Sequence, residues 1–123
     1  MYEVSIEAGA NESRYWASLA FTDQKGIRHE RQVGKDCISS KRSNLLQAAI
    51  DALGEIQNPC TIILYSNSED LNEPIRNGWV RQWAGREWKN AKGKTVRNAE
   101  QWQKIYEAME KYSIEARYTD GRR

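Results

Sequence analysis

Apolar and polar residues alternate over the first third of the chain, with the two-residue period that is typical of β-strands. Residues 2–8 place their apolar side chains on one side, namely Tyr2, Val4, Ile6 and Ala8. Gly9-Ala10-Asn11 is expected to end this strand. A second strand is expected over residues 14–22 and a third over 27–33, joined by a hairpin turn at Asp23-Gln24-Lys25-Gly26.

The period changes to that of a helix after residue 40. The apolar residues then form one stripe at helical spacing: Leu45, Leu46, Ala49, Ala52, Leu53 and Ile56. Ser39 or Ser40 can cap the start of this helix, and Asn58-Pro59 is expected to stop it. The short apolar run over residues 61–65 is typical of a buried strand.

Further helices and one more strand are expected in the second half of the chain. Ser68, followed by two acidic residues, indicates a helix start, because acids are favoured at the positive end of the helix dipole. Pro74 and Gly78 are expected to interrupt this region. The remaining pattern predicts helices over 79–88 and 98–111, a loop over 90–95 and a last strand over 114–118.

The order of these elements is β-β-β-α-β-α-α-α-β. Tight turns make the first three strands antiparallel, whereas the later strands alternate with helices. We therefore expect an α/β fold with a five-stranded mixed sheet, three antiparallel strands followed by parallel strands, flanked by helices. The pattern alone leaves several topologies open. The 123 residues are expected to form a single domain over 1–123.

Charge is distributed unevenly along the chain. The net charge is +2, but residues 76–104 contain eight basic and two acidic residues, which gives this segment +6 and leaves −4 elsewhere. The same segment contains Trp79, Trp83, Trp88 and Trp102. A basic, aromatic segment of this kind suggests a surface that binds polyanions. The alternative is a solvated helix whose tryptophans pack in the core.

Composition excludes several other classes of function. No apolar run approaches the roughly 18 residues that a membrane span needs, and Met1-Tyr2-Glu3-Val4 is typical of a strand rather than a signal peptide, so we expect a cytoplasmic protein without a membrane partner. Cys37 and Cys60 are expected to be reduced and packed, since no second Cys or His lies at ligand spacing. His29 is expected to be a surface side chain.

Residues 79–103 carry a specific motif: W-x3-W-x4-W-K-N-A-K-G-K-T-V-R-N-x3-W-Q. This motif resembles the basic protrusion, or handle, of bacterial type 1 ribonuclease H and the helix after it. Residues 45–53, L-L-Q-A-A-I-D-A-L, resemble the family's first helix, and residues 61–68, T-I-I-L-Y-S-N-S, resemble its fourth strand. The resemblance extends over nearly the whole chain and implies a ribonuclease H-like fold with a basic, tryptophan-rich handle at about 76–104.

The resemblance also implies a chemistry, hydrolysis of phosphodiesters by two Mg²⁺ ions about 4 Å apart, held by four carboxylates. This sequence departs from the family at each of the four positions. Glu7, Leu45 and Asn67 stand at the first three, and the sequence reaches Arg123 without the family's last helix. One carboxylate cannot hold two divalent cations. We therefore expect no catalytic residue, no metal ligand set and no cofactor, and Mg²⁺ binding that is weak or absent.

The substrate-binding side keeps its cations. Lys41 and Arg42 stand where the family typically has asparagines. The expected contact residues of the handle lie at or beyond the end of its first helix: Trp88, Lys89, Lys92, Lys94 and Arg97. Lysine and arginine neutralise phosphates without reading sequence. Trp79, Trp83 and Trp102 are expected mainly to pack in the core.

Three functions stay open at this point. The first is a non-catalytic domain that binds nucleic acid, an RNA–DNA hybrid or another duplex, through the handle. The second is a protein-interaction or structural module, in which a partner chain or a dimer mate covers the sheet face left by the missing last helix. The third, which we rank last, is a metal-dependent hybrid endonuclease.

Overall fold

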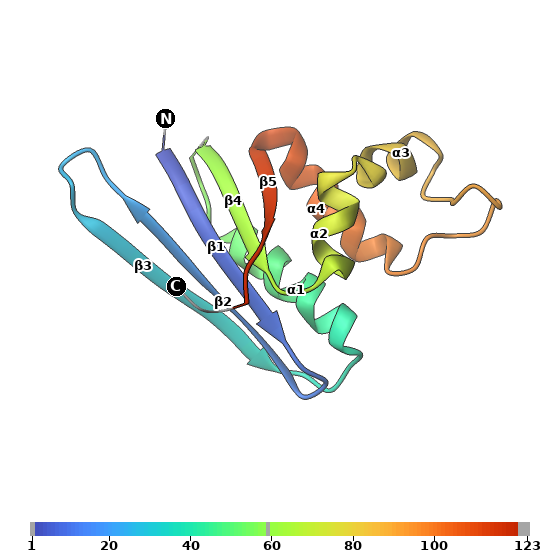
Figure 1. Cartoon of the computed structure of the whole chain (residues 1–123), viewed down its shortest axis with the longest axis horizontal. Helices are drawn as coiled ribbons and strands as arrows, with labels where there is room; N and C mark the ends of the chain where they lie inside the picture. The colour runs from blue at the N-terminus through green and yellow to red at the C-terminus, as the bar shows by residue number, and fades with distance from the viewer. Residues whose placement is uncertain (1, 59, 121–123) are drawn as a thin grey trace.

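The computed structural model describes residues 2–58 and 60–120 and contains one five-stranded sheet in the order β3-β2-β1-β4-β5 (Figure 1). The strands are β1 (Tyr2–Ala10), β2 (Arg14–Thr22), β3 (Arg28–Asp36), β4 (Cys60–Ser66) and β5 (Ser113–Tyr118). The first three pair antiparallel, while β4 pairs parallel with both β1 and β5. The predicted mixed sheet and the predicted order of elements are confirmed.

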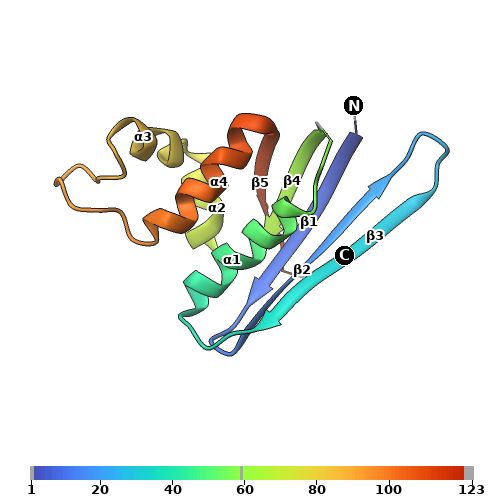
Figure 2. The same ribbon diagram turned by 180° about the vertical axis from the view of Figure 1, so that it is seen from behind.

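The helices are α1 (Lys41–Gly54), α2 (Glu69–Arg76), α3 (Trp79–Gly85) and α4 (Ala99–Lys111). Ser40 caps α1, because its side chain accepts a hydrogen bond from the Ser43 amide, and Ser68 caps α2 in the same way through the Asp70 amide. Figure 2 shows α1 and α4 side by side against one face of the sheet. No described helix is both long enough and apolar enough to span a bilayer.

The single core lies between the sheet and these helices. Alternate strand residues point into it, and among them Ile6, Ile62 and Leu64 are fully buried. Every described helix contributes to the same core, so none of them builds a second core on the opposite face of the sheet. A hydrogen bond of 2.6 Å, donated by the Tyr15 hydroxyl to Asp51, joins β2 to α1 inside this layer.

Several predicted boundaries were wrong, each for a local reason. β1 continues through Gly9 and Ala10, because both residues pair with β2. Pro74 lies buried inside α2, where its missing N–H costs only one helical hydrogen bond. The predicted helix over 79–88 ends at Gly85, since Glu87 and Trp88 have positive φ angles of 55° and 65°. Pro59, one half of the predicted helix stop, lies outside the described residues.

Candidate nucleic-acid interface

The resemblance points first to the end of the sheet where β1 and β4 finish beside the start of α1. Leu45, in the second turn of α1, is only 2% exposed and belongs to the hydrophobic core. Asn67 follows β4 directly and is exposed. The two positions therefore have different surroundings, one apolar and closed, the other in contact with solvent.

Glu7 does not lie level with Asn67. In the parallel register of β1 and β4, Glu7 pairs with Tyr65, so the same register continued by two residues brings Gly9 level with Asn67. Gly9 carries no side chain, and a Cβ atom there would lie 2.6 Å from Nε1 of Trp16. Gly9, covered by the Trp16 indole, therefore lies beside Asn67. The sequence pattern did not predict this neighbour.

The other nearby acids are engaged elsewhere. Asp51 accepts hydrogen bonds from Tyr15 at 2.6 Å and from Gln47 at 2.8 Å. Burial, reinforced by the bond to Asp51, raises the pKa of Tyr15 to about 12. Asp70 pairs with Arg42 at 3.0 Å. In residues 2–58 and 60–120 no three His, Cys, Asp or Glu side chains gather closely enough to hold a metal ion. The residues present therefore do not fit a pair of divalent cations.

The handle loop, residues 86–98, projects away from the sheet (Figure 1). Its tip is an ordered turn. Lys89 and Thr95 form an antiparallel bridge, and the Asn90 amide donates to the Lys94 carbonyl at 2.8 Å. The Asn90 side chain accepts hydrogen bonds from the amides of Lys92 and Lys94, and Gly93 supplies the positive φ of 78° that closes the turn. These bonds order the backbone from which the exposed lysine side chains project.

The cations of the basic segment fall into two groups. Arg76 pairs with Glu69, and Arg81 pairs with Glu110 at 3.7 Å. The other six form no ion pair with any described residue: Arg86, Lys89, Lys92, Lys94, Arg97 and Lys104. All six are exposed. Five of them lie on the handle loop, so most of the uncompensated positive charge of the segment is found there.

The four tryptophans of the handle region have different surroundings. Trp102 is 3% exposed, and half-buried Trp83 packs edge-on against it with ring centroids 5.8 Å apart, so the predicted core role is confirmed for these two. Trp79 is 37% exposed and differs from that prediction. Trp88, predicted as a contact residue, is half-buried and packs edge-on against Tyr106.

A groove of about 330 Å³ lies between α2 and the handle. Trp79 and Trp83 line it together with Arg97, and the body of the protein contributes Arg42 and three acids, Glu69, Asp70 and Glu73. The groove therefore connects the unpaired cations of the handle to the first turn of α1, where exposed Lys41 also lies. The groove offers an aromatic surface and two guanidinium groups, but its three acids mean that it carries no excess of positive charge.

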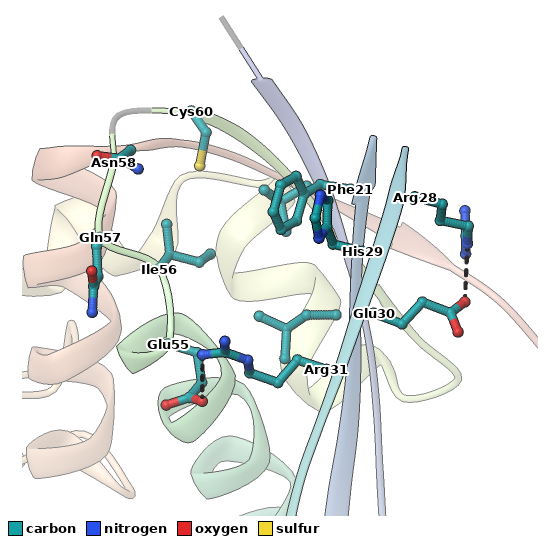
Figure 3. Close-up of a pocket in the computed structure, with 12 residues that line it drawn as sticks. Phe21, Arg28, His29, Glu30, Arg31, Glu55, Ile56, Gln57, Asn58 and Cys60 are labelled. Atoms are coloured by element: carbon teal, nitrogen blue, oxygen red, sulfur yellow. Dashed lines mark hydrogen bonds and ion pairs between the residues drawn. The ribbon is translucent and has the colours of Figure 1, made fainter. Parts of the chain in front are cut away.

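A second, larger groove of about 570 Å³ lies at the other end of α1 (Figure 3). The ring of His29 stacks on Phe21 at its rim, which agrees with the predicted surface position of His29. Its cations are compensated: Arg28 pairs with Glu30 at 2.9 Å and Arg31 with Glu55 at 3.3 Å. Buried Cys60, whose thiol pKa is raised by burial, forms part of its lining. This charge balance does not fit a polyanion.

Comparison with known proteins was made on both sequence and structure. The family model described as RNase H matches residues 8–122. The ribonuclease H of Chlorobium phaeovibrioides is 44% identical over 69 residues, which cover 56% of this chain and 47% of that protein. The ribonuclease H of Xanthomonas oryzae pv. oryzae is 32% identical over 106 residues, 86% of this chain and 68% of that protein. The chain thus spans between about half and two thirds of the length of these relatives.

Solved structures agree on the fold. LC9-RNase H1, described as a type 1 RNase H with the type 2 active-site motif, superposes with a TM-score of 0.72 over 98% of this chain and 64% of its own, at 20% identity. The foamy viral protease-reverse transcriptase, solved in complex with an RNA/DNA hybrid, superposes with a TM-score of 0.67 over 98% of this chain and 18% of its own, at 14% identity.

Proposed function

The chain belongs to the ribonuclease H family, and from this premise we propose that it binds an RNA–DNA hybrid or a similar duplex through its handle without cutting it. The observation that carries the proposal is the group of unpaired cations on the handle loop. An ordered turn that presents Lys89, Lys92 and Lys94, followed by Arg97, offers positive charge that no described carboxylate neutralises. Such charge favours phosphates whatever their sequence.

The groove beside the handle adds an aromatic surface to the site, whereas its three acids leave the excess of positive charge on the handle loop. Trp79 is partly exposed there, and Arg97 and Arg42 lie along the same groove. Arg42 forms an ion pair with Asp70 at 3.0 Å, so it contributes less uncompensated positive charge than the loop cations. The foamy viral protease-reverse transcriptase, which shares this fold, was solved in complex with an RNA/DNA hybrid, so this duplex is the first ligand to test.

The absence of cleavage rests on three positions. Leu45 is closed in the core, Asn67 carries an amide, and Gly9, level with Asn67, lies under the Trp16 indole. Two divalent ions carry four positive charges and need several carboxylates in one place. Glu7 alone, paired with Tyr65 in the register, does not provide them.

The experiment is a titration of labelled hybrid, duplex RNA and duplex DNA at several salt concentrations. With three or four phosphate contacts, the slope of log affinity against log salt should be roughly −3 to −4. A variant with Lys89, Lys92, Lys94 and Arg97 all changed to alanine should lose most of that slope and bind much more weakly.

The matched control removes four cations elsewhere, Lys25, Arg28, Arg31 and Lys111, so that the net charge falls equally. The proposal requires the control to keep the parent's slope. Equal weakening in both variants would mean that net charge, not the handle, attracts the ligand. A parent that binds no nucleic acid at low salt would instead favour a protein-interaction module, for which the sheet face without a described helix is the obvious surface.

A further inference from the structure

Trp16 stands on the sheet face that points away from the helices, and it is 40% exposed there. Its cross-strand partners on both sides are glycines, Gly9 on β1 and Gly34 on β3. A Cβ atom at Gly9 would lie within 2.8 Å of three indole atoms, and one at Gly34 would lie 2.9 Å from the Tyr15 carbonyl. The indole therefore lies against the bare backbone of β1, and neither partner carries a side chain that could cover it.

Arg14 lies two residues earlier on the same face of β2. Its guanidinium carbon is 5.5 Å from the centroid of the Trp16 ring, within the range of a cation–π contact. Arg14 forms no ion pair with any described residue, although Asp36 is its backbone partner on β3. An exposed indole with an unpaired guanidinium over its ring can bind a base and its phosphate in single-stranded nucleic acid, once the long arginine side chain moves off the ring.

This pair lies near the start of α1, although the handle groove itself lies on the helix side of the sheet. The segment just before Arg14 is tied to the segment that leads into α1, because the Cys37 amide donates to Ser13 and the Ser39 amide to Glu12. The first turn of α1 then carries Lys41 and Arg42, and Arg42 lines the handle groove. Figures 1 and 2 show the β1–β2 turn and the start of α1 together at one end of the sheet.

We propose that Trp16 and Arg14 form a second nucleic-acid contact, in which an unpaired base takes the place of the Arg14 guanidinium over the indole and Arg14 meets the adjoining phosphate. The inference rests on the proposed function and extends it from a duplex to a duplex with a single-stranded end. An unpaired base is required, because a paired base inside a duplex has both faces covered by its neighbours. Glu7 lies on the same sheet face, so the phosphate belongs on the Arg14 side of the indole.

The test compares a blunt hybrid with the same hybrid carrying a single-stranded overhang that contains 5-iodouracil. The parent should bind the overhang form more tightly, by about tenfold, which is the usual value of one stacked base. Irradiation should then cross-link the overhang to Trp16, within the tryptic peptide Tyr15–Lys25. Trp16→Leu should lose both the cross-link and the tenfold preference, Trp16→Phe should keep most of the preference, and Arg14→Ala should reduce it and flatten the salt slope by about one unit.

The outcomes separate the two proposals. A parent that binds the blunt hybrid but shows no preference for the overhang, or cross-links outside Tyr15–Lys25, overturns this inference and leaves the handle proposal intact. A parent that binds neither form overturns both. If Trp16→Leu folds poorly, Trp16→Phe and Arg14→Ala still test the contact. The contact is contradicted if Arg14→Ala keeps the full preference for the overhang and the parent shows no cross-link to Trp16.

Discussion

Leu45 stands where the family resemblance puts a catalytic acid, but in this structure it is a core residue. It is 2% exposed and packs in the same core as Leu46 and Ile6. Leu45→Ala should lower the free energy of unfolding by about 2–4 kcal/mol, because it removes buried methyl groups and leaves a cavity. Urea denaturation would measure this. Ile38→Ala, at a position that is 94% exposed, is the control and should change stability by less than about 0.5 kcal/mol.

Because Gly9 contacts Trp16, the effect of Gly9→Ala on the free energy of unfolding should have the opposite sign to the usual one. Alanine normally costs less than glycine in a strand, by roughly 0.5–1 kcal/mol. In the parent, Gly9→Ala should instead destabilise, because its Cβ would meet the indole at 2.6 Å. In a Trp16→Ala background the same change should be neutral or stabilising, giving a coupling free energy of about 1 kcal/mol or more. Equal effects in both backgrounds would show that the indole does not rest on Gly9.

At the scale of helices and strands, local patterns predicted most of the fold. The apolar stripe and Ser40 located α1, and Ser68 with its acids located α2, because caps and periodicity depend only on neighbouring residues. The bounds of β2 were predicted to the residue. Trp88 was predicted at the end of a helix, but consecutive positive φ angles at Glu87 and Trp88 are backbone choices that no periodicity encodes.

The candidate site was predicted less well, for a different reason. That Glu7 faces Tyr65 rather than Asn67 follows from the register of β1 against β4, two strands far apart in the chain. Arg42 was predicted to contact nucleic acid, and its ion pair with Asp70 at 3.0 Å was not part of that prediction. Pairings between distant segments are decided by packing, which the sequence pattern of either segment alone does not contain. The grouping of Lys89, Lys92 and Lys94 could be predicted because these residues lie on or beside one local turn.

The bond between β2 and α1 predicts how stability depends on pH. Burial, together with Asp51, raises the pKa of Tyr15 in the folded protein from the ordinary value of 10.0 to about 12, because both favour the neutral phenol. The folded state therefore keeps this proton when the unfolded state has lost it. The contribution of Tyr15 to stability is complete below about pH 10 and should be lost as the pH rises from 10 to 12.

Tyr15→Phe tests this dependence. It should cost about 1–2 kcal/mol at neutral pH, since Asp51 loses a hydrogen-bond donor, and the fall in stability between pH 10 and 12 should become shallower. Chemical denaturation across that range would measure both effects. Tyr118→Phe, at a 59% exposed side chain, is the control and should leave the profile unchanged. An identical high-pH profile in parent and Tyr15→Phe would contradict the assignment.

For the whole molecule, the proposed function separates binding from cleavage. Purified protein should release no product above background from a labelled hybrid with Mg²⁺ or Mn²⁺, because the acids it retains do not converge. Glu7→Ala should not change this result, and it should leave hybrid binding within about twofold, since Glu7 lies outside the handle groove. Metal-dependent turnover that disappears in Glu7→Ala would show instead that the chain is a catalytic member of its family.

The place of β1 between β2 and β4 also constrains how the chain folds. β1, β2 and β3 are consecutive hairpin strands, so their contacts are local and can form early. β4 enters only after α1 has been made, and until then one edge of β1, with its row of unpaired amides and carbonyls, stays open to any other strand. During synthesis the meander is complete at Asp36, and β4 ends at Ser66, so the edge of β1 stays exposed while the next 30 residues are made. Refolding yield should therefore fall with protein concentration more steeply than the stability of the finished fold suggests.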